Sequence, residues 1–413
     1  MCTSGPACVV DVSAGELHSC AVYAGRIKCW GGNGDGQLGL GDQRDRGAYM
    51  DELGDQLLAV NLGSGQTAAA VAAGGRHTCA LLDGGGIKCW GNNAVGQLGL
   101  GDRRSRILAA DLGDQLPFVD LGAGRKAKAI SAGLWHTCVV LDDGTVKCWG
   151  DNRMGQLGLG DIVNRGDDPG EMGDNLPAVD LGVSAPVIQL ATGAFHTCAL
   201  LGSRELKCWG WNDVGELGLA DAHGRAPGQM GVQLPSVNLR RGVASMAVGA
   251  FHSCAIFDGT ADVKCWGLNR SGQLGQGVTT DSIGPSSDST PPLPSVDLGS
   301  GRRATSLSLG ATHSCALLDD QAVRCWGYNF DGELGIGSTD NRGRALADMG
   351  DNLPETRVSG AVRSIAAGAN HTCAVSANQV YCWGLNTRGQ LGTGDDANRG
   401  DKSKPLTPVD LGH

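Results

Sequence analysis

The sequence predicts an all-β fold, a seven-bladed β-propeller, and three observations support it. One motif recurs seven times at intervals of 56 to 61 residues. A fixed period of this length is typical of a repeat architecture. Each copy contains short β-rich runs separated by Gly, Asp and Asn turns, and no long helical periodicity is present. The repeats are centred on His18, His77, His136, His196, His252, His313 and His371.

Each repeat divides into four segments, as expected for a propeller blade of three or four strands. In the second repeat the first segment is residues 57–63, and the second contains His77 and ends at Leu81. A Gly-rich turn leads to the third segment, Ile-Lys-Cys-Trp-Gly at residues 87–91. The fourth is Gly-Gln-Leu-Gly-Leu-Gly-Asp at residues 96–102, and a polar linker follows it.

The two ends of the sequence predict how the ring closes. The chain begins inside a repeat, at residues 9–20, and this first copy lacks the segment Leu-Pro-x-Val-Asp-Leu-Gly. The equivalent segment, Thr-Pro-Val-Asp-Leu-Gly, forms residues 407–412. We therefore expect an overlap of N- and C-terminal strands in one blade, which removes an open sheet edge. The repeats run almost from end to end, so residues 1–413 are predicted to be a single propeller domain.

Composition excludes several classes of partner. The formal net charge is −10, and an acidic surface repels the phosphate backbone, so nucleic acid is not an expected partner. No run of 18 apolar residues exists, so no membrane span is predicted. The first six residues have neither the basic nor the apolar region of a signal peptide.

Each repeat carries two Cys, separated by 9 to 11 residues. Hairpin turns of different length explain this variation: three residues at 142–144, two at 377–378 and four at 258–261. The two Cys then lie opposite each other in every hairpin, at a Cα separation of about 4.5 Å, which suits a disulfide. The predicted disulfides are Cys20–Cys29, Cys79–Cys89, Cys138–Cys148, Cys198–Cys208, Cys254–Cys265, Cys315–Cys325 and Cys373–Cys382.

Two alternatives to disulfides are reduced, buried Cys side chains and zinc binding. The pattern His-x-Cys…Cys offers three zinc ligands, but each of the seven sites lacks a fourth. Cys2 and Cys8 lie outside the repeats, so they either pair with each other or reach a segment outside this sequence. A disulfide-rich set implies an oxidising compartment, so we expect an extracellular or cell-surface location, although no signal peptide is visible.

The repetition of the His and Asp residues favours structural roles over catalysis. We expect each imidazole to bond loop backbone, with His and Cys on one face of a blade and Trp on the other. No catalytic, cofactor-binding or metal-binding residue is predicted. The aspartates at the Gly-Asp ends are expected to cap turns, with calcium binding as the alternative. These aspartates are Asp42, Asp102, Asp161 and Asp395.

Two kinds of short motif resemble signals known from extracellular proteins. The tripeptides Arg-Gly-Asp at 165–167 and 399–401 resemble an integrin-binding sequence, but they lie in equivalent linkers, so repeat inheritance explains them. Asn269 begins a glycosylation sequon in an expected turn and is the predicted modified site. A second sequon, at Asn370, adjoins a buried His and is not expected to be modified.

The repeat Ala-Gly-x-x-His-Thr-Cys-Ala-Leu … Val-Lys-Cys-Trp-Gly-x-Asn-x-x-Gly-Gln-Leu-Gly-Leu-Gly-Asp resembles that of the regulator of chromosome condensation (RCC1) family over essentially the whole chain. The resemblance implies a seven-bladed propeller whose termini share a blade. Founding members of that family catalyse nucleotide exchange on a nuclear GTPase and bind chromatin through a basic tail. This chain is acidic and shows neither such a tail nor a wedge-like insertion. Its Cys pairs look like those of a Cys-bearing branch found in large extracellular repeat proteins.

We therefore predict a non-enzymatic, secreted or cell-surface binding and scaffold module that binds protein or glycan through loops on a propeller face. It is expected to work within a larger extracellular assembly. The alternative is a guanine nucleotide exchange factor for a small GTPase, which predicts free thiols and a reducing compartment. A third hypothesis, an enzyme with its site over the central channel, requires a non-repeated group of His, Glu and Arg residues at that channel.

Overall fold

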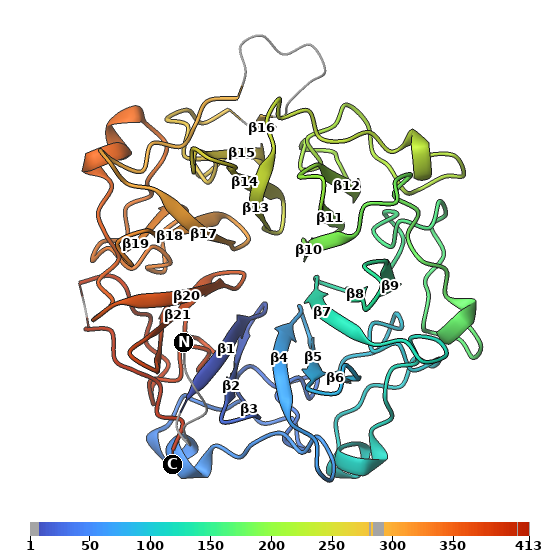
Figure 1. Ribbon diagram of the computed structural model, residues 1–413. Helices are drawn as coiled ribbons and strands as arrows, with labels where there is room; N and C mark the ends of the chain where they lie inside the picture. The colour runs from blue at the N-terminus through green and yellow to red at the C-terminus, as the bar shows by residue number, and fades with distance from the viewer. Residues whose placement is uncertain (1–7, 281, 284–292, 403, 413) are drawn as a thin grey trace.

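The computed structural model describes residues 8–280, 282–283, 293–402 and 404–412, which form a ring of seven small antiparallel sheets (Figure 1). Six sheets have three strands and one has four, so the all-β, seven-bladed prediction is confirmed. The helices among the described residues are single 3₁₀ turns, and none has the length and apolar character needed to cross a membrane. These turns are η1 (Met50–Glu52), η2 (Gly54–Gln56), η3 (Ala109–Asp111), η4 (Gly113–Gln115), η5 (Gly173–Asn175), η6 (Gly231–Gln233), η7 (Leu346–Asp348) and η8 (Gly350–Asn352).

Within each blade the chain runs outward from the central channel. The inner strands are β1 (Val9–Ala14), β4 (Ala68–Ala73), β7 (Ala127–Ala132), β10 (Val187–Thr192), β13 (Val243–Val248), β17 (Ala304–Leu309) and β20 (Val362–Ala367). The middle strands are β2 (His18–Tyr23), β5 (His77–Leu82), β8 (His136–Leu141), β11 (His196–Leu201), β14 (His252–Phe257), β18 (His313–Leu318) and β21 (His371–Ser376). The outer strands are β3 (Arg26–Gly31), β6 (Ile87–Gly91), β9 (Val146–Gly150), β12 (Leu206–Gly210), β15 (Val263–Leu268), β19 (Val323–Gly327) and β22 (Gln379–Gly384), and β16 (Ser282–Ile283) extends the fifth blade.

The turns between middle and outer strands have the predicted lengths. In the third blade Gly144 takes a φ of 84°, the left-handed conformation that a hairpin turn of this kind needs. In the seventh, Ala377 and Asn378 both have positive φ, and Ser376 pairs directly with Gln379. These turns keep the Cys residues in register across all seven hairpins.

Among the described residues, the first and last segments of the chain pair in different blades, whereas the sequence predicted that they share one. The segment that follows each hairpin pairs with the outer strand of that same hairpin, as when Val60 N–H donates to the Ile27 carbonyl at 2.8 Å. In the same way Val409 N–H donates to the Val380 carbonyl at 2.7 Å, so the C-terminal segment completes the seventh blade, while β1 pairs with β2 in the first. The prediction was wrong because a circular repeat has no marked start, and we divided the period one segment too early.

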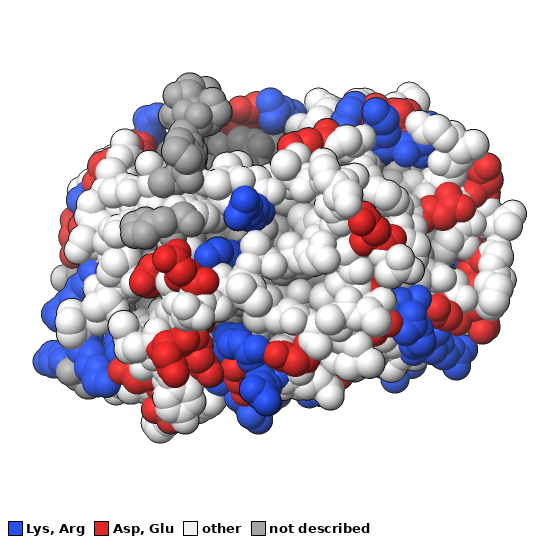
Figure 2. Space-filling model, turned by 90° about the horizontal axis from the view of Figure 1, so that it is seen from below, with Lys and Arg blue, Asp and Glu red and all other residues white. Residues whose placement is uncertain are grey.

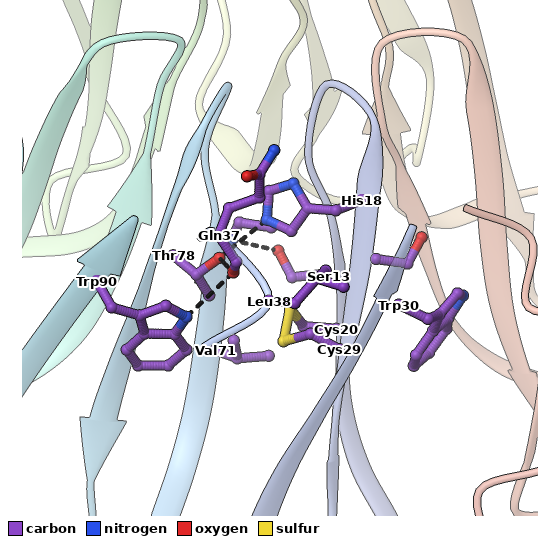
Figure 3. The surroundings of a disulfide bond; sticks show 12 residues. Ser13, His18, Cys20, Cys29, Trp30, Gln37, Leu38, Val71, Thr78 and Trp90 are labelled. Carbon is purple, nitrogen blue, oxygen red and sulfur yellow. Dashed lines mark hydrogen bonds between the residues drawn. A yellow bond between two sulfur atoms is a disulfide. The ribbon is translucent and has the colours of Figure 1, made fainter. Parts of the chain in front are cut away.

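The hydrophobic core is distributed between neighbouring blades rather than along the channel. The predicted division of faces is confirmed, because the Cys face of one blade packs against the Trp face of the next. The Cys20–Cys29 pair, for example, shares a buried cluster with Val71 and Trp90 of the second blade (Figure 3). All seven repeated Trp side chains are fully buried. Burial of ~200 Å² in each indole at ~25 cal/mol per Å² makes these rings a large share of the interblade free energy.

Candidate functional site

Seven disulfides cross the hairpins between middle and outer strands. In each, the two Cys are paired residues of the antiparallel ladder with a Cα separation of 4.1 Å. The structure therefore matches the cross-strand geometry expected from the sequence. Cys8 is buried, whereas Cys2 lies outside the described residues, so the pairing of these two stays a prediction.

The repeated His side chains bind a hydroxyl of the next blade. This differs from the bonds to loop backbone that the sequence predicted. His18 Nε2 lies 2.9 Å from Thr78 Oγ1 (Figure 3), and the seventh blade returns to the first through His371 Nε2 and Ser19 Oγ at 2.8 Å. The backbone pattern identified the His face but not the neighbour that faces it. The seven bonds join His18–Thr78, His77–Thr137, His136–Thr197, His196–Ser253, His252–Ser314, His313–Thr372 and His371–Ser19.

A backbone carbonyl fixes the direction of these hydrogen bonds. Thr78 Oγ1 donates to the Gln37 carbonyl at 2.8 Å, and Trp90 Nε1 donates to the same oxygen at 3.0 Å. Since the hydroxyl proton is used there, Thr78 Oγ1 accepts from the His18 Nε2–H. Burial lowers the pKa of His18 to about 3, which keeps the ring neutral and leaves it unsuited to acid–base catalysis near neutral pH.

The central channel has a mouth that is lined by small residues. Its cavity of about 150 Å³ is bordered mainly by Gly and Ala at the ends of the inner strands. A Cβ at Gly15 would lie 2.4 Å from the Gly74 carbonyl oxygen, so the close approach of inner strands requires glycine. Glu16 is the one charged residue among the described residues that line it. No converging His, Glu and Arg group is present there, so an enzyme site over the channel gains no support within the described chain.

Around this mouth the seven-fold pattern is broken by aromatic side chains. Two positions of each repeat lie side by side here, the residue before the His and the residue after Cys-Trp-Gly, as when Trp211 N–H donates to the Phe195 carbonyl at 2.9 Å. In the third to sixth blades these positions and their neighbours carry aromatic rings, which we call the aromatic sector. It consists of Trp135, Phe195, Trp211, Phe251, Tyr328 and Phe330.

The rings of the aromatic sector pack against one another in two groups. Trp211 lies between Phe195 and Phe251 of the next blade, at centroid distances of 6.1 and 5.6 Å and in nearly perpendicular orientations. Tyr328 and Phe330 make a second pair at 6.5 Å. Phe330 is 69% exposed and the other rings are partly exposed. Such half-exposed aromatic groups are typical of binding surfaces.

Sequence reasoning missed the aromatic sector, although a signal was present. Of the nine Trp, only Trp135 and Trp211 lie outside the repeated Cys-Trp-Gly position, and both belong to the sector. The repeat motif consists of residues that the seven copies share, whereas this surface consists of residues in which they differ. In the first, second and seventh blades the two positions carry no aromatic ring: they are Leu17 and Gly32, Arg76 and Asn92, and Asn370 and Leu385.

Two buried carboxylic acids lie beneath the aromatic sector. Glu216 and Glu333 replace the Gln of Gly-Gln-Leu-Gly, and both side chains are fully buried. One carboxyl oxygen of Glu216 accepts the Val214 N–H at 3.1 Å, and the other has no partner within the described chain. Burial raises the pKa of Glu216 to about 7 and that of Glu333 to about 8.

Both acids lie in blades that carry an aromatic residue directly after Cys-Trp-Gly. In the second blade Gln97 Nε2 donates to Asn92 Oδ1 at 2.9 Å, at the position after Cys-Trp-Gly. In the fourth and sixth blades that position is Trp211 or Tyr328, which offers no carboxyl or amide oxygen. A Gln there would lack this acceptor, as Gln273 and Gln390 do in the fifth and seventh blades, so the repeat carries either Gln or Glu where the acceptor is absent.

The repeated aspartates cap turns as predicted. Asp102 Oδ1 accepts the Arg104 N–H at 2.9 Å, and Asp102 Oδ2 pairs with Arg106 at 2.7 Å. The same pairing with the Arg four residues later occurs at Asp42, Asp161 and Asp395. The Arg-Gly-Asp sequences are held by similar contacts: Asp167 is 6% exposed and pairs with Arg103 at 2.9 Å.

The predicted glycosylation site is contradicted by burial. The Asn269 side chain is fully buried; its Nδ2 donates to the Val278 carbonyl at 2.7 Å and its Oδ1 accepts the Leu274 N–H at 3.0 Å. A glycan needs this amide nitrogen at the surface. Asn269 instead holds its loop together, a role that the sequon alone does not reveal.

The outer edge of the ring carries mixed charge. On the side shown in Figure 2, acidic and basic residues are interspersed, without a broad surface of one sign. Ion pairs such as Arg46–Asp42 at 2.6 Å contribute to this mixture. Proteins that follow a phosphate backbone present a basic stripe, and this side of the ring has none.

Comparison with known proteins identifies the family to which this chain belongs. The family model described as "RCC1-like domain" matches residues 3–287. The model of the regulator of chromosome condensation (RCC1) repeat matches residues 262–317, 322–375 and 378–412. The chain belongs to the RCC1-like family. Its similarity to the ultraviolet-B receptor UVR8 of Arabidopsis thaliana is 31% identity over 400 residues, covering 96% of this chain and 81% of the receptor.

Other RCC1-like proteins differ in length and in sequence. The probable E3 ubiquitin-protein ligase HERC4 of Rattus norvegicus is 29% identical over 75% of this chain, which spans 32% of that ligase. Yeast RCC1 (Prp20), solved with Kap60, has a TM-score of 0.67 at 21% identity, over 95% of this chain and 85% of that one. The ectodomain of the Arabidopsis thaliana receptor kinase ACR4 has a TM-score of 0.51 at 18% identity, over 95% and 98% of the two chains. At these identities the solved structures show a shared fold alone.

Proposed function

We propose that this RCC1-like propeller is a non-enzymatic binding module, secreted or at a cell surface, that engages a protein partner through the aromatic sector. The observation that carries the proposal is the edge-to-face group Phe195–Trp211–Phe251 at the channel mouth. Large rings contribute contact area at a low cost in conformational entropy, and Trp and Tyr dominate binding energies at interfaces. A glycan could stack on the same rings, so the binding test distinguishes the two.

The disulfides support the proposed location. Seven pairs at bonding distance are stable in an oxidising compartment, whereas the cytosol keeps thiols reduced. The Cys-bearing extracellular branch of the family is the group to which we assign the chain. The occurrence of this fold in receptor-kinase ectodomains is consistent with such an assignment.

A count of free thiols in the protein from its native source tests the location. The protein is alkylated without reductant, digested, and examined by mass spectrometry for linked peptides such as Cys79–Cys89. We expect no free thiol among the fourteen repeat Cys. A set of free repeat Cys would refute the oxidising compartment, and nucleotide exchange on a small GTPase would then be the activity to assay.

Affinity measurements on substituted proteins test the binding face. A partner cross-linked to the native protein is identified, and its Kd is measured for the wild type and for Trp211→Ala with Phe251→Ala. Leu385→Ala is the matched control, because Leu385 has the position of Trp211 in the seventh blade, outside the sector. We expect the double substitution to weaken binding by about tenfold or more and the control to leave it unchanged. Equal affinities of the wild type and the double variant would refute the assignment of this face. If the protein binds purified glycan and no protein partner, the ligand is a carbohydrate.

A further inference from the structure

A polar cavity lies on the fourth blade, at the end of the hairpin opposite to the aromatic sector. The aromatic sector adjoins the His196 end of β11, whereas this cavity adjoins the β11–β12 turn. Its volume is about 370 Å³, a size that accommodates a small ligand. The cavity is bordered by the turn residues 203–206 and by residues 236–243 of the segment that follows the hairpin.

Three arginines border this cavity in a chain whose net charge is −10. Arg241 forms an ion pair with Asp262 at 3.2 Å. Arg204 and Arg240 are exposed, and neither forms an ion pair with any described residue. Glu205 is the one carboxylate among the described residues of the lining, and it accepts a hydrogen bond from the Ser203 hydroxyl at 3.2 Å. The cavity therefore carries an excess of positive charge.

The equivalent cavity of the sixth blade shows what has been changed. There Arg302 is neutralised by Asp320 and by Glu355, the latter at 2.9 Å. In the fourth blade the residues at the two carboxylate positions are Ser203 and Ser236. Ala185 stands at the position of Arg302, so the fourth blade lacks this whole ion-pair group. Its cavity instead carries Arg204, Arg240 and Arg241 against the single carboxylate of Glu205.

The backbone at one of these arginines favours a role for its side chain. Arg204 and Arg240 have φ values of 70° and 58°, in the left-handed region that L-residues with a Cβ adopt at a cost. The position of Arg240 is occupied in other repeats by glycines such as Gly63 and Gly299, with φ of 100° and 101°. Glycine would relieve the strain. Gln321 has the same φ of 70° at the equivalent turn position of the sixth blade, so the conformation of Arg240 is the one that favours a role for its side chain.

We propose that this cavity binds an oxyanion, the sulfate or phosphate ester group of a small ligand. Guanidinium groups donate paired hydrogen bonds that match the oxygens of such an ester, and serine hydroxyls complete its coordination. Arg204 belongs to the hairpin turn and Arg240 to the segment that follows the hairpin. Ser236 also lines the cavity, and the Ser203 hydroxyl, which donates to Glu205 in the structure, lies beside Arg204 in the chain. This site is separate from the aromatic sector and does not depend on the function proposed for it.

Calorimetric titration of the full chain tests the proposal. The probes are glucose 6-sulfate and glucose 6-phosphate, with glucose and an equal concentration of chloride as references. We expect one or both esters to bind and glucose not to bind. The variants are Arg240→Gly, which restores the usual residue of the repeat and so does not threaten folding, and Arg204→Ser. The matched control is Arg302→Ser in the neutralised cavity of the sixth blade.

Each of the two fourth-blade substitutions is expected to weaken ester binding by about tenfold or more, because each removes a charge-assisted donor. The control variant should bind like the wild type. Preference for one ester identifies whether sulfate or phosphate is the natural group. The proposal is overturned if neither ester binds at millimolar concentration, or if Arg240→Gly binds as tightly as the wild type while its thermal unfolding shows that it is folded.

Discussion

Replacement of the two buried acids by amides, Glu216→Gln with Glu333→Gln, is expected to stabilise the propeller at neutral and alkaline pH. The substitution keeps the acceptor for the Val214 N–H and restores the residue that five other repeats carry. The new amide nitrogen has no evident acceptor, but neither Gln273 Nε2 nor Gln390 Nε2 has one within the described chain. The repeat therefore tolerates this arrangement twice already.

The pKa values give the magnitude and the sign of the effect. The folded pKa of Glu216 is about 7 against an ordinary 4.5, a gap worth about 3 kcal/mol, and the gap to about 8 for Glu333 is worth about 5 kcal/mol. Since both folded pKa values are raised, the stability that these groups contribute is fully present below pH 4.5. It is lost as the pH rises, to about pH 7 for Glu216 and about pH 8 for Glu333.

Denaturant unfolding with the disulfides intact, followed across this pH range, is the assay. The double variant and the wild type should be equally stable near pH 4.5, and the variant should gain steadily above it. Asp213→Asn is the control, because this neighbour of Glu216 is exposed and should leave the pH dependence almost unchanged. If the difference between variant and wild type is the same at every pH, the acids do not titrate in this way and the reasoning is refuted.

Two further predictions concern contacts between and within blades. Replacement of Cys138 and Cys148 by Ser should lower the free energy of unfolding by about 2 to 3 kcal/mol, because the closed loop is short; an unchanged denaturation midpoint under reductant would contradict this. Thr78→Val should cost about 1 to 3 kcal/mol in the same assay, because it leaves the His18 Nε2–H buried without an acceptor, whereas Thr67→Val at an exposed site should cost far less.

The sequence determined most of the fold because its decisive features are local. The Cys spacing together with the Gly144 turn defines the hairpin register, and the alternation along β5 and β6 assigns His77 and Trp90 to opposite faces. The prediction failed where the partner is distant in sequence. No pattern near His18 indicates that Thr78, 60 residues later, supplies its acceptor. The predicted glycosylation of Asn269 was wrong for a related reason, because a sequon does not indicate whether its Asn is buried.

The candidate site was less predictable than the fold, because the residues that recur in every repeat are those that pack the blades. Residues common to all copies report on blade packing, which every blade must solve in the same way. A partner contacts only part of the ring, so its contacts lie where copies differ, as at Trp211 and Arg240. These positions become interpretable once the structure shows that Phe195 and Phe251, from two blades, converge on one ring.

Opposing titrations of the His and Glu residues predict a maximum of stability near neutral pH. Burial lowers the pKa of the seven repeated His to about 3 or 4, so their stabilisation is present above pH 6.5 and is lost as the pH falls below it. The two Glu act in the opposite direction up to about pH 8. Stability is greatest where the unfolded and folded chains bind equal numbers of protons, which for these nine groups is about pH 7. The Glu-to-Gln double variant should instead reach a plateau above this pH. A wild-type maximum of stability well below pH 6 would show that the imidazoles titrate in the folded ring. The conclusion that the seven hydrogen-bonded His side chains are neutral would then be wrong.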